Sequence, residues 1–379
     1  MNRYYIIIYW ALFFNMLIFS SCGHKIQEAG LSNIFIPLAE KQVLPANELF
    51  DSIRFVRLET TDSCLIPEFS ATSTCILWKN EYFYLASSFD ISIFDSNGKW
   101  VRTISHRGNG PGEYQYVSAF MVNDNDEIFI MDRVKKSVLL YSSNDIFLKS
   151  YHYGDSLSIQ NIGNLNDSLF VLTSSSFGDG CKFHIVHKKT QEITNSYWPT
   201  KSHIFSYAYK YNFPYYQGKL LFHEYQNNSV FEITPDRAIL RYMIDIDGRI
   251  PPDGYWAQDI PWDQLLREHT ARGYIDNIEF FAESDKHILL RYSGSPESSL
   301  RGNVWIDKMN GESILFDKIA FDNALTWEPG RIIYSLADGW LVFPIPVDQL
   351  FTVENSEFRN QFPNLLEDDN PILCIAKIR

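Results

Sequence analysis

The chain of 379 residues is long enough for one large domain, or two medium ones, with a substantial core. Aromatic residues make up 16% of it, which favours β-structure because large flat side chains pack well on pleated sheets. The formal net charge of -13 argues against nucleic-acid binding unless basic residues gather in one patch, and the sequence has no such patch.

Residues 1–21 have the pattern of a signal peptide: Arg3 supplies a positive charge, and residues 6–19 supply an apolar run. This run is short for a membrane span, so cleavage is expected. Small residues stand directly before Cys22, and this junction is similar to the lipobox of bacterial lipoproteins, whose cysteine is lipidated. We therefore expect lipidation of Cys22 and a linker over 22–33. An ordinary signal peptide that is cleaved nearby is the alternative.

Few cysteines remain after such a cleavage: Cys64, Cys75, Cys181 and Cys374. They are too sparse in a chain of this length for a disulfide scaffold. Cys64 and Cys75 could pair, although buried free thiols are the favoured interpretation. The spacing of cysteines and histidines predicts no zinc site.

β-rich units recur along the chain at intervals of about 40 to 60 residues, and a period of this size with several strands per unit indicates a β-propeller. The clearest units cover 81–105 and 127–151, in which Phe94 and Tyr141 occupy the same place. Weaker copies follow at 168–197, 219–245 and 287–316, with a half-unit at 339–350.

The stretch "HRGNGPGEY", residues 106–114, lies between the last strand of one unit and the first strand of the next. A phosphate-binding loop would need a lysine or a following helix, and neither is present. We interpret the stretch as a crossing turn between blades. Glycines give the backbone its freedom and proline stiffens the turn, and we expect Asp132 to cap the next turn. The loop residues concerned are Gly108, Gly110, Pro111 and Gly112.

Residues 107–141 resemble an NHL repeat, a propeller-blade motif with a glycine-rich loop and an aspartate after the next strand. With "LETT" at 58–61 and "EDDNPILCIAKIR" at 367–379, the chain resembles the six-bladed β-propeller lipoproteins of Bacteroides-like bacteria, which are NHL-repeat-like or TolB-like. The resemblance covers residues 34–379 and implies an all-β fold, one six-bladed propeller of four-stranded antiparallel blades. The family has no settled activity and no catalytic residues that could be carried over to this sequence. Five or seven blades are the alternatives.

Two strand-like segments, 33–38 and 54–59, precede the first full unit. A propeller is a ring, so its first and last blades must join or leave an unpaired edge. We therefore expect at least one of these segments to complete the last blade beside 371–378.

The histidines do not form a metal-binding pattern. His184 and His187 are three residues apart on a predicted strand, so their side chains should face opposite sides of the sheet. His223 and His287 stand at different places in their strands. The sequence also has no G-x-S-x-G nucleophile motif. No metal, cofactor or catalytic residue is therefore expected.

Residues 250–278 interrupt the β-units, and the sequence predicts a helix over 262–272 that follows Pro261 and ends before Gly273. The candidate binding residues are the aromatic side chains Tyr255, Trp256 and Trp262. Tyrosine and tryptophan supply large contact areas for a protein partner or a sugar ring. The alternative is that they pack the helix onto the blades.

Together these patterns predict a lipoprotein of the bacterial cell envelope, anchored in the outer membrane and facing the periplasm or the surface. Its propeller is expected to be a non-enzymatic binding or scaffold domain for a protein or carbohydrate partner. The lipid is its expected membrane contact. The alternative is a hydrolase or lyase acting on sugars or peptides at the axial pore. Polar side chains that converge there from several blades would favour the enzyme.

Overall fold

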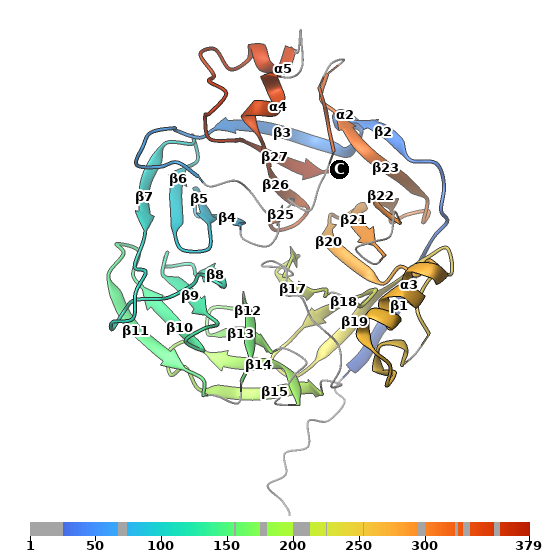
Figure 1. The fold of residues 1–379 in the computed structure, drawn as a ribbon, viewed down its shortest axis with the longest axis horizontal. Coiled ribbons are helices and arrows are strands. Elements are labelled where there is room, and N and C mark those ends of the chain that lie inside the picture. Colours follow the sequence, from blue (N-terminus) through green and yellow to red (C-terminus); the bar gives the residue numbers. More distant parts are fainter. Residues whose placement is uncertain are drawn as a thin grey trace, which may run out of the picture.

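The computed structural model describes residues 26–66, 74–154, 157–174, 180–199, 213–224, 226–252, 254–294, 300–322, 325–328, 334–351 and 357–379. Six β-sheets are arranged in a ring around a central axis (Figure 1). The chain is therefore the six-bladed β-propeller that the sequence predicts, and the alternatives with five or seven blades are excluded.

Blades 1, 2 and 3 are four-stranded antiparallel sheets, each built from consecutive strands that run from the axis outward. Blade 1 contains β4 (Cys75–Lys79), β5 (Tyr82–Ala86), β6 (Ile91–Asp95) and β7 (Trp100–Ile104). Blade 2 contains β8 (Ala119–Val122), β9 (Ile128–Asp132), β10 (Ser137–Tyr141) and β11 (Phe147–His152). Blade 3 contains β12 (Ile159–Asn164), β13 (Leu169–Ser174), β14 (Cys181–His187) and β15 (Ile193–Pro199).

Blades 4 and 5 each gain a strand from the N-terminal part of the chain. Blade 4 contains β16 (Tyr215–Tyr216), β17 (Lys219–Phe222), β18 (Ser229–Ile233) and β19 (Ala238–Ile246), and β1 (Ile26–Ile36) pairs in parallel with β19. Blade 5 contains β20 (Asn277–Glu283), β21 (His287–Ser293), β22 (Arg301–Asp307) and β23 (Ser313–Ala320). There β2 (Gln42–Pro45) pairs in parallel with β23, and β24 (Thr326–Trp327) also pairs with β23. β1 begins within the range 22–33 in which a linker is expected.

Blade 6 closes the ring with strands from both ends of the chain. It contains β25 (Tyr334–Ser335), β26 (Trp340–Ile345), β27 (Ile372–Ile378) and β3 (Phe50–Arg57). β3 pairs antiparallel with β27, so that Phe55 lies opposite Cys374. The expected closure is thus confirmed, and the segment around 54–59 provides it. The other strand-like segment, 33–38, overlaps β1 on blade 4 instead.

The faces of neighbouring blades pack against one another, and this explains which strands are apolar throughout and which alternate between apolar and polar residues. The middle strands β9 and β10 are buried along their whole length, because a neighbouring blade covers each face. The outermost strand β11 alternates between partly buried and exposed residues, because solvent reaches one of its faces. Phe94 and Tyr141, at equivalent places in blades 1 and 2, are both fully buried in one core.

The two ends of the ring differ in their connections. At one end, which we call the short-turn face, the strands are joined by tight turns such as 80–81, 96–99, 142–146 and 234–237. Because the strands are antiparallel, the other connections lie at the opposite end, which we call the long-loop face. They include 105–118, 247–276 and 346–371, and they carry the helices α3 (Trp262–Arg272), α4 (Val347–Phe351) and α5 (Glu357–Asn360) and the short helix η1 (Tyr255–Ala257). A further short helix, α2 (Ala46–Leu49), precedes β3.

Cys64, Cys75 and Cys374 are buried free thiols, so Cys64 and Cys75 do not pair. Burial raises the pKa of the Cys374 thiol well above its usual range, which makes this group a poor nucleophile. Among the helices in the described ranges, none combines the length and the apolar character that crossing a membrane requires.

Candidate functional site

The glycine-rich loop crosses from β7 of blade 1 to β8 of blade 2 on the long-loop face. Gly112 has a φ of 75°, and a Cβ there would lie 2.6 Å from Cγ of Phe147. A Cβ on Gly108 would collide with the Glu113 carboxylate, which accepts a hydrogen bond of 2.7 Å from the Gly110 N–H. Pro111 is exposed between these glycines. The loop glycines therefore provide backbone freedom and room for one internal carboxylate.

Asp132 joins this loop to the turn that follows β9. Its side chain is fully buried, and Oδ1 accepts hydrogen bonds from the N–H groups of Val134 (2.9 Å) and Lys135 (3.1 Å). Oδ2 accepts a third bond from the N–H of Gln115, at 2.7 Å. The aspartate therefore caps the turn and also ties it to the crossing loop. All three donors are backbone N–H groups of the protein, so these bonds of the Asp132 carboxylate hold the loop in shape. This fits a structural role for the loop.

The insertion contains the predicted helix. α3 follows Pro261 and ends at Gly273, whose φ of 65° is the left-handed conformation that glycine adopts readily. Figure 1 shows α3 toward the outer edge of the ring, at blades 4 and 5. Tyr255 is buried, and its hydroxyl donates a hydrogen bond of 2.9 Å to the carbonyl of Leu265. This position does not fit a binding role for Tyr255, because the ring packs the helix and the hydroxyl is already used.

Trp256 and Trp262 are partly exposed, and their ring centres lie 5.6 Å apart. The ring of Trp256 also lies 5.0 Å from that of His269, which is fully buried. His269 Nε2 is 3.2 Å from Oδ1 of Asp276. Burial raises the pKa of Asp276 above its usual range, although the neighbouring His269 and Trp256 side chains oppose the shift. The structure thus gathers the predicted aromatic residues around one buried polar pair, and two of them reach the surface.

Polar side chains that sequence reasoning did not single out are buried near the long-loop end of blades 3, 4 and 5. Lys182 of blade 3 forms an ion pair with Glu224 beside blade 4, with 2.5 Å between Nζ and Oε2. In blade 5, Arg291 pairs with Glu279 at 2.9 Å. Such pairs hold neighbouring strands in place, because separating the partners would leave a buried charge uncompensated and so lower the stability of the fold. Their only sequence signal is a charged residue that interrupts an apolar strand.

His184 and His187 face opposite sides of β14, as their spacing predicts, whereas His223 lies just after β17. His184 is buried between the hydroxyls of Ser174 and Ser196, whereas His187 is partly exposed on the opposite side of the same strand. His223 is buried, and burial lowers its pKa to about 4, so it is neutral at pH 7. Within the described ranges, no three His, Cys, Asp or Glu side chains are grouped so that they could hold a metal ion.

A cavity of about 230 Å³ lies on the propeller axis, lined from blades 1, 2, 3, 4 and 6. Its described lining is mainly apolar, with side chains that include Leu77, Phe120, Ile162, Phe213 and Leu336. Lys79, at its edge, forms an ion pair with Asp124 on the surface. The polar part of the lining comes from Asn161 and Asn164 of blade 3, Tyr215 of blade 4, and Ser335 and Asp338 of blade 6. Polar side chains from several blades thus reach the axis, although apolar side chains outnumber them in the described lining.

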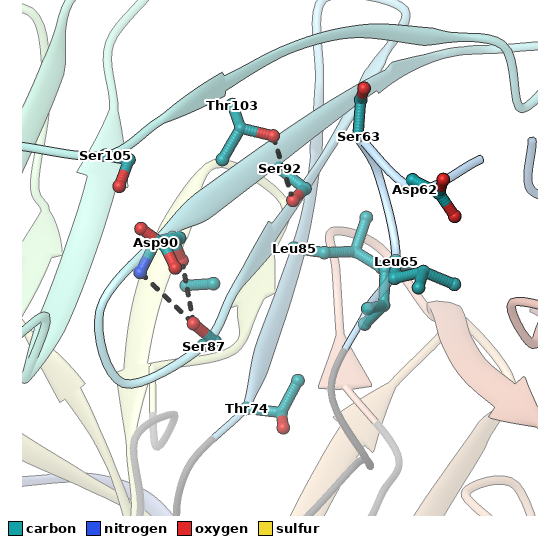
Figure 2. A pocket seen from close by; sticks show the side chains of 12 residues that line it. Asp62, Ser63, Leu65, Thr74, Leu85, Ser87, Asp90, Ser92, Thr103 and Ser105 are labelled. Carbon is teal, nitrogen blue, oxygen red and sulfur yellow. Dashed lines mark hydrogen bonds between the residues drawn. The ribbon is translucent and has the colours of Figure 1, made fainter. Parts of the chain in front are cut away.

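A second cavity, of about 200 Å³, lies on the long-loop face at blade 1. Figure 2 shows its lining, in which Asp62, Asp90 and several hydroxyl groups surround a space bounded by Leu65 and Leu85. The hydroxyl side chains are those of Ser63, Thr74, Ser87, Ser92, Thr103 and Ser105. The sequence gives no signal for this cavity, because its residues come from separate connections and strands that only the folded blade brings together.

A family model described as a domain of unknown function (DUF4934) matches residues 32–377. The chain belongs to this family. This DUF4934 chain is similar to a predicted exported protein of Bacteroides fragilis NCTC 9343, with a TM-score of 0.72 and 18% identity over 92% of this chain and 100% of that one. It is also similar to a DUF4221 family member of Bacteroides vulgatus, with a TM-score of 0.47 and 11% identity over 87% of this chain and 97% of the other. No curated protein matches the DUF4934 chain.

Proposed function

We propose that this DUF4934 protein is a lipid-anchored binding protein of the cell envelope whose propeller recognises a protein or carbohydrate partner on its long-loop face. The observation that carries the proposal is the difference between the two ends of the ring. The short-turn face has tight hairpins, whereas the long-loop face carries the longer connections and the helical insertion. Binding residues usually collect on loops that a rigid scaffold holds in place.

The envelope location has two supports. The Bacteroides fragilis neighbour is a predicted exported protein. The apolar run and the small residues before Cys22 resemble a lipoprotein signal. The alternative function, a hydrolase or lyase at the axial pore, has less support, because the described lining of the axial cavity is mainly apolar and its charged residues are engaged elsewhere. Lys79 forms an ion pair with Asp124, and Asp338 accepts a hydrogen bond from the N–H of Gln217.

Trp262 is the leading contact residue for a partner. It is the first residue of α3 and is partly exposed, whereas Trp256 packs against three other rings. An aromatic side chain in this setting offers a broad contact surface at a small entropic cost. Trp256 is therefore expected to contribute both to the contact and to the stability of the insertion.

Replacement of Trp262 by alanine is expected to weaken partner binding by about 2 kcal/mol, or roughly thirtyfold, with little change in melting temperature. Replacement of Trp256 should lower both affinity and melting temperature. The probes are a glycan array and immobilised protein fractions from the envelope of a Bacteroides strain, and affinities are then measured for the strongest binder.

Tyr255→Phe is the matched control, because it removes only the buried hydrogen bond to Leu265. It should lower the melting temperature and leave the affinity unchanged. A Trp262→Ala protein that loses much of its stability but binds normally would show that this ring only packs the helix, and the proposed contact would be wrong.

A further inference from the structure

The cavity of Figure 2 offers a second place for recognition, separate from the aromatic insertion. It lies at blade 1, whereas α3 lies at blades 4 and 5 on the other side of the ring (Figure 1). Any ligand of this cavity would therefore bind independently of a partner at Trp262.

The charge of the cavity is negative. Asp62 is exposed and Asp90 partly exposed, and neither carboxylate has an ion-pair partner in the part of the chain that the structure describes. The described lining contains no lysine, arginine or histidine. Of the nearby basic residues, Arg107 is held 3.9 Å over the ring of Phe89, and Arg102 donates a hydrogen bond to a carbonyl of blade 2. The cavity should therefore repel phosphates and carboxylates and attract cations.

Hydroxyl groups make up most of the remaining polar lining. Oγ of Ser92 and Oγ1 of Thr103 lie 3.3 Å apart and share a hydrogen bond, which Figure 2 marks. Ser63 and Ser105 are exposed, and their hydroxyls have no protein partner within the described ranges. A serine hydroxyl both donates and accepts hydrogen bonds, so these groups match the hydroxyls of a ligand. Apolar side chains such as Leu65 complete the wall.

The size of the cavity limits the ligand. Its volume of about 200 Å³ is below the range of roughly 300–1,000 Å³ in which drug-sized molecules are usually bound. It therefore suits one sugar ring, a short amino alcohol, or the end of a longer chain. A divalent cation is a weaker match, because Asp62 and Asp90 have no third acidic or histidine ligand grouped with them in the described residues.

We propose that this cavity binds a protonated primary amine that carries neighbouring hydroxyl groups, as in amino sugars and amino alcohols. Asp90 recognises the ammonium group, because a charge-assisted hydrogen bond is the strongest that such a ligand can form here. Asp62 lies on the opposite side of the cavity and adds to its negative charge. The serine hydroxyls bind the hydroxyl groups of the ligand. The apolar wall excludes water from one side of it.

Isothermal titration calorimetry with three sugars of the same ring size tests the proposal on the full protein. D-glucosamine is expected to bind at least about tenfold more tightly than D-glucose, and D-glucuronate not to bind, because these ligands differ in charge. Raised sodium chloride should weaken the binding of glucosamine. Ethanolamine distinguishes the source of the amine: equal affinity would assign an amino alcohol, and clearly weaker affinity an amino sugar.

The variant Asp90→Asn should bind glucosamine about tenfold more weakly with an unchanged melting temperature, and Asp62→Asn should weaken binding by a smaller factor. Asp368→Asn is the matched control, because it removes one exposed carboxylate that lies outside the cavity. It should bind normally. Equal binding of glucose and glucosamine, binding of glucuronate, binding of calcium alone, or folded Asp90→Asn protein with full affinity would each overturn the proposal.

Discussion

Replacement of Glu283 by alanine is expected to lower the free energy of unfolding by about 3 kcal/mol, the lower end of the range for breaking a buried ion pair. Glu283 ends β20 of blade 5, and its carboxylate is fully buried. It accepts hydrogen bonds from Arg241 (2.8 and 2.9 Å), Tyr242 (2.7 Å) and Lys308 (2.7 Å). The lower end applies because Arg241 and Lys308 keep about a fifth of their side-chain surface exposed and can still reach water.

The contribution of the Glu283 carboxylate to the free energy of unfolding should depend on pH. Burial raises the pKa of Glu283, but the hydrogen bonds from Arg241, Lys308 and Tyr242 outweigh it, so the pKa lies below its ordinary value of 4.5. A carboxyl whose pKa is lower in the folded state stabilises the protein fully above its unfolded pKa. This contribution is lost as the pH falls through the folded pKa. Glu283→Gln should therefore unfold with a weaker dependence on acid below about pH 5.

Urea unfolding at pH 7 and in steps below pH 5 measures both effects. Glu232→Gln is the control, because Glu232 pairs with Lys219 on the surface and an exposed pair contributes less than about 1 kcal/mol. If Glu283→Ala lost no more stability than this surface variant, the joint between blades 4 and 5 would not depend on the buried carboxylate.

Replacement of Cys22 by alanine is expected to abolish lipid attachment and to release the protein from the membrane fraction or leave its signal peptide uncleaved. Cys22 lies outside the described residues, so this proposal rests on the apolar run and the small residues before it. A lipidated N-terminus carries several acyl chains, which is sufficient for stable anchoring, whereas one chain is marginal. The loss should therefore be nearly complete.

Metabolic labelling with an alkyne fatty acid, followed by membrane fractionation, makes the comparison. Cys64→Ala serves as the control, because Cys64 is a buried thiol within the propeller. It should keep both the label and the membrane association. A wild-type protein without label would instead indicate an ordinary signal peptide, and a labelled Cys22→Ala protein would place the lipid elsewhere.

The features that could be predicted from the sequence depend on neighbours in the chain. The units 81–105 and 127–151 show strand alternation and turns within a few residues, and both proved to be parts of blades. The helix 262–272 was predicted at the correct bounds, because Pro261 and Gly273 mark its ends locally.

The features that could not be predicted depend on contacts between distant residues. The parallel pairing of β1 with β19 is one of them, because many strand-like segments could cover that edge. The ion pair of Lys182 with Glu224 is another, since neither residue is part of a local motif. The cavity of Figure 2 combines Asp62 with Thr103, and single hydroxyl residues in strands carry no signal of their own.

Recognition on the long-loop face is tested most directly by hydrogen–deuterium exchange of the backbone amides, with and without the strongest binder from the glycan and protein panels. We predict slower exchange in 105–118 or 247–276 when the partner is bound, because these connections lie on that face. The turns 96–99, 142–146 and 234–237 should exchange at the same rate in both states. Protection confined to these short turns would contradict the proposed binding face.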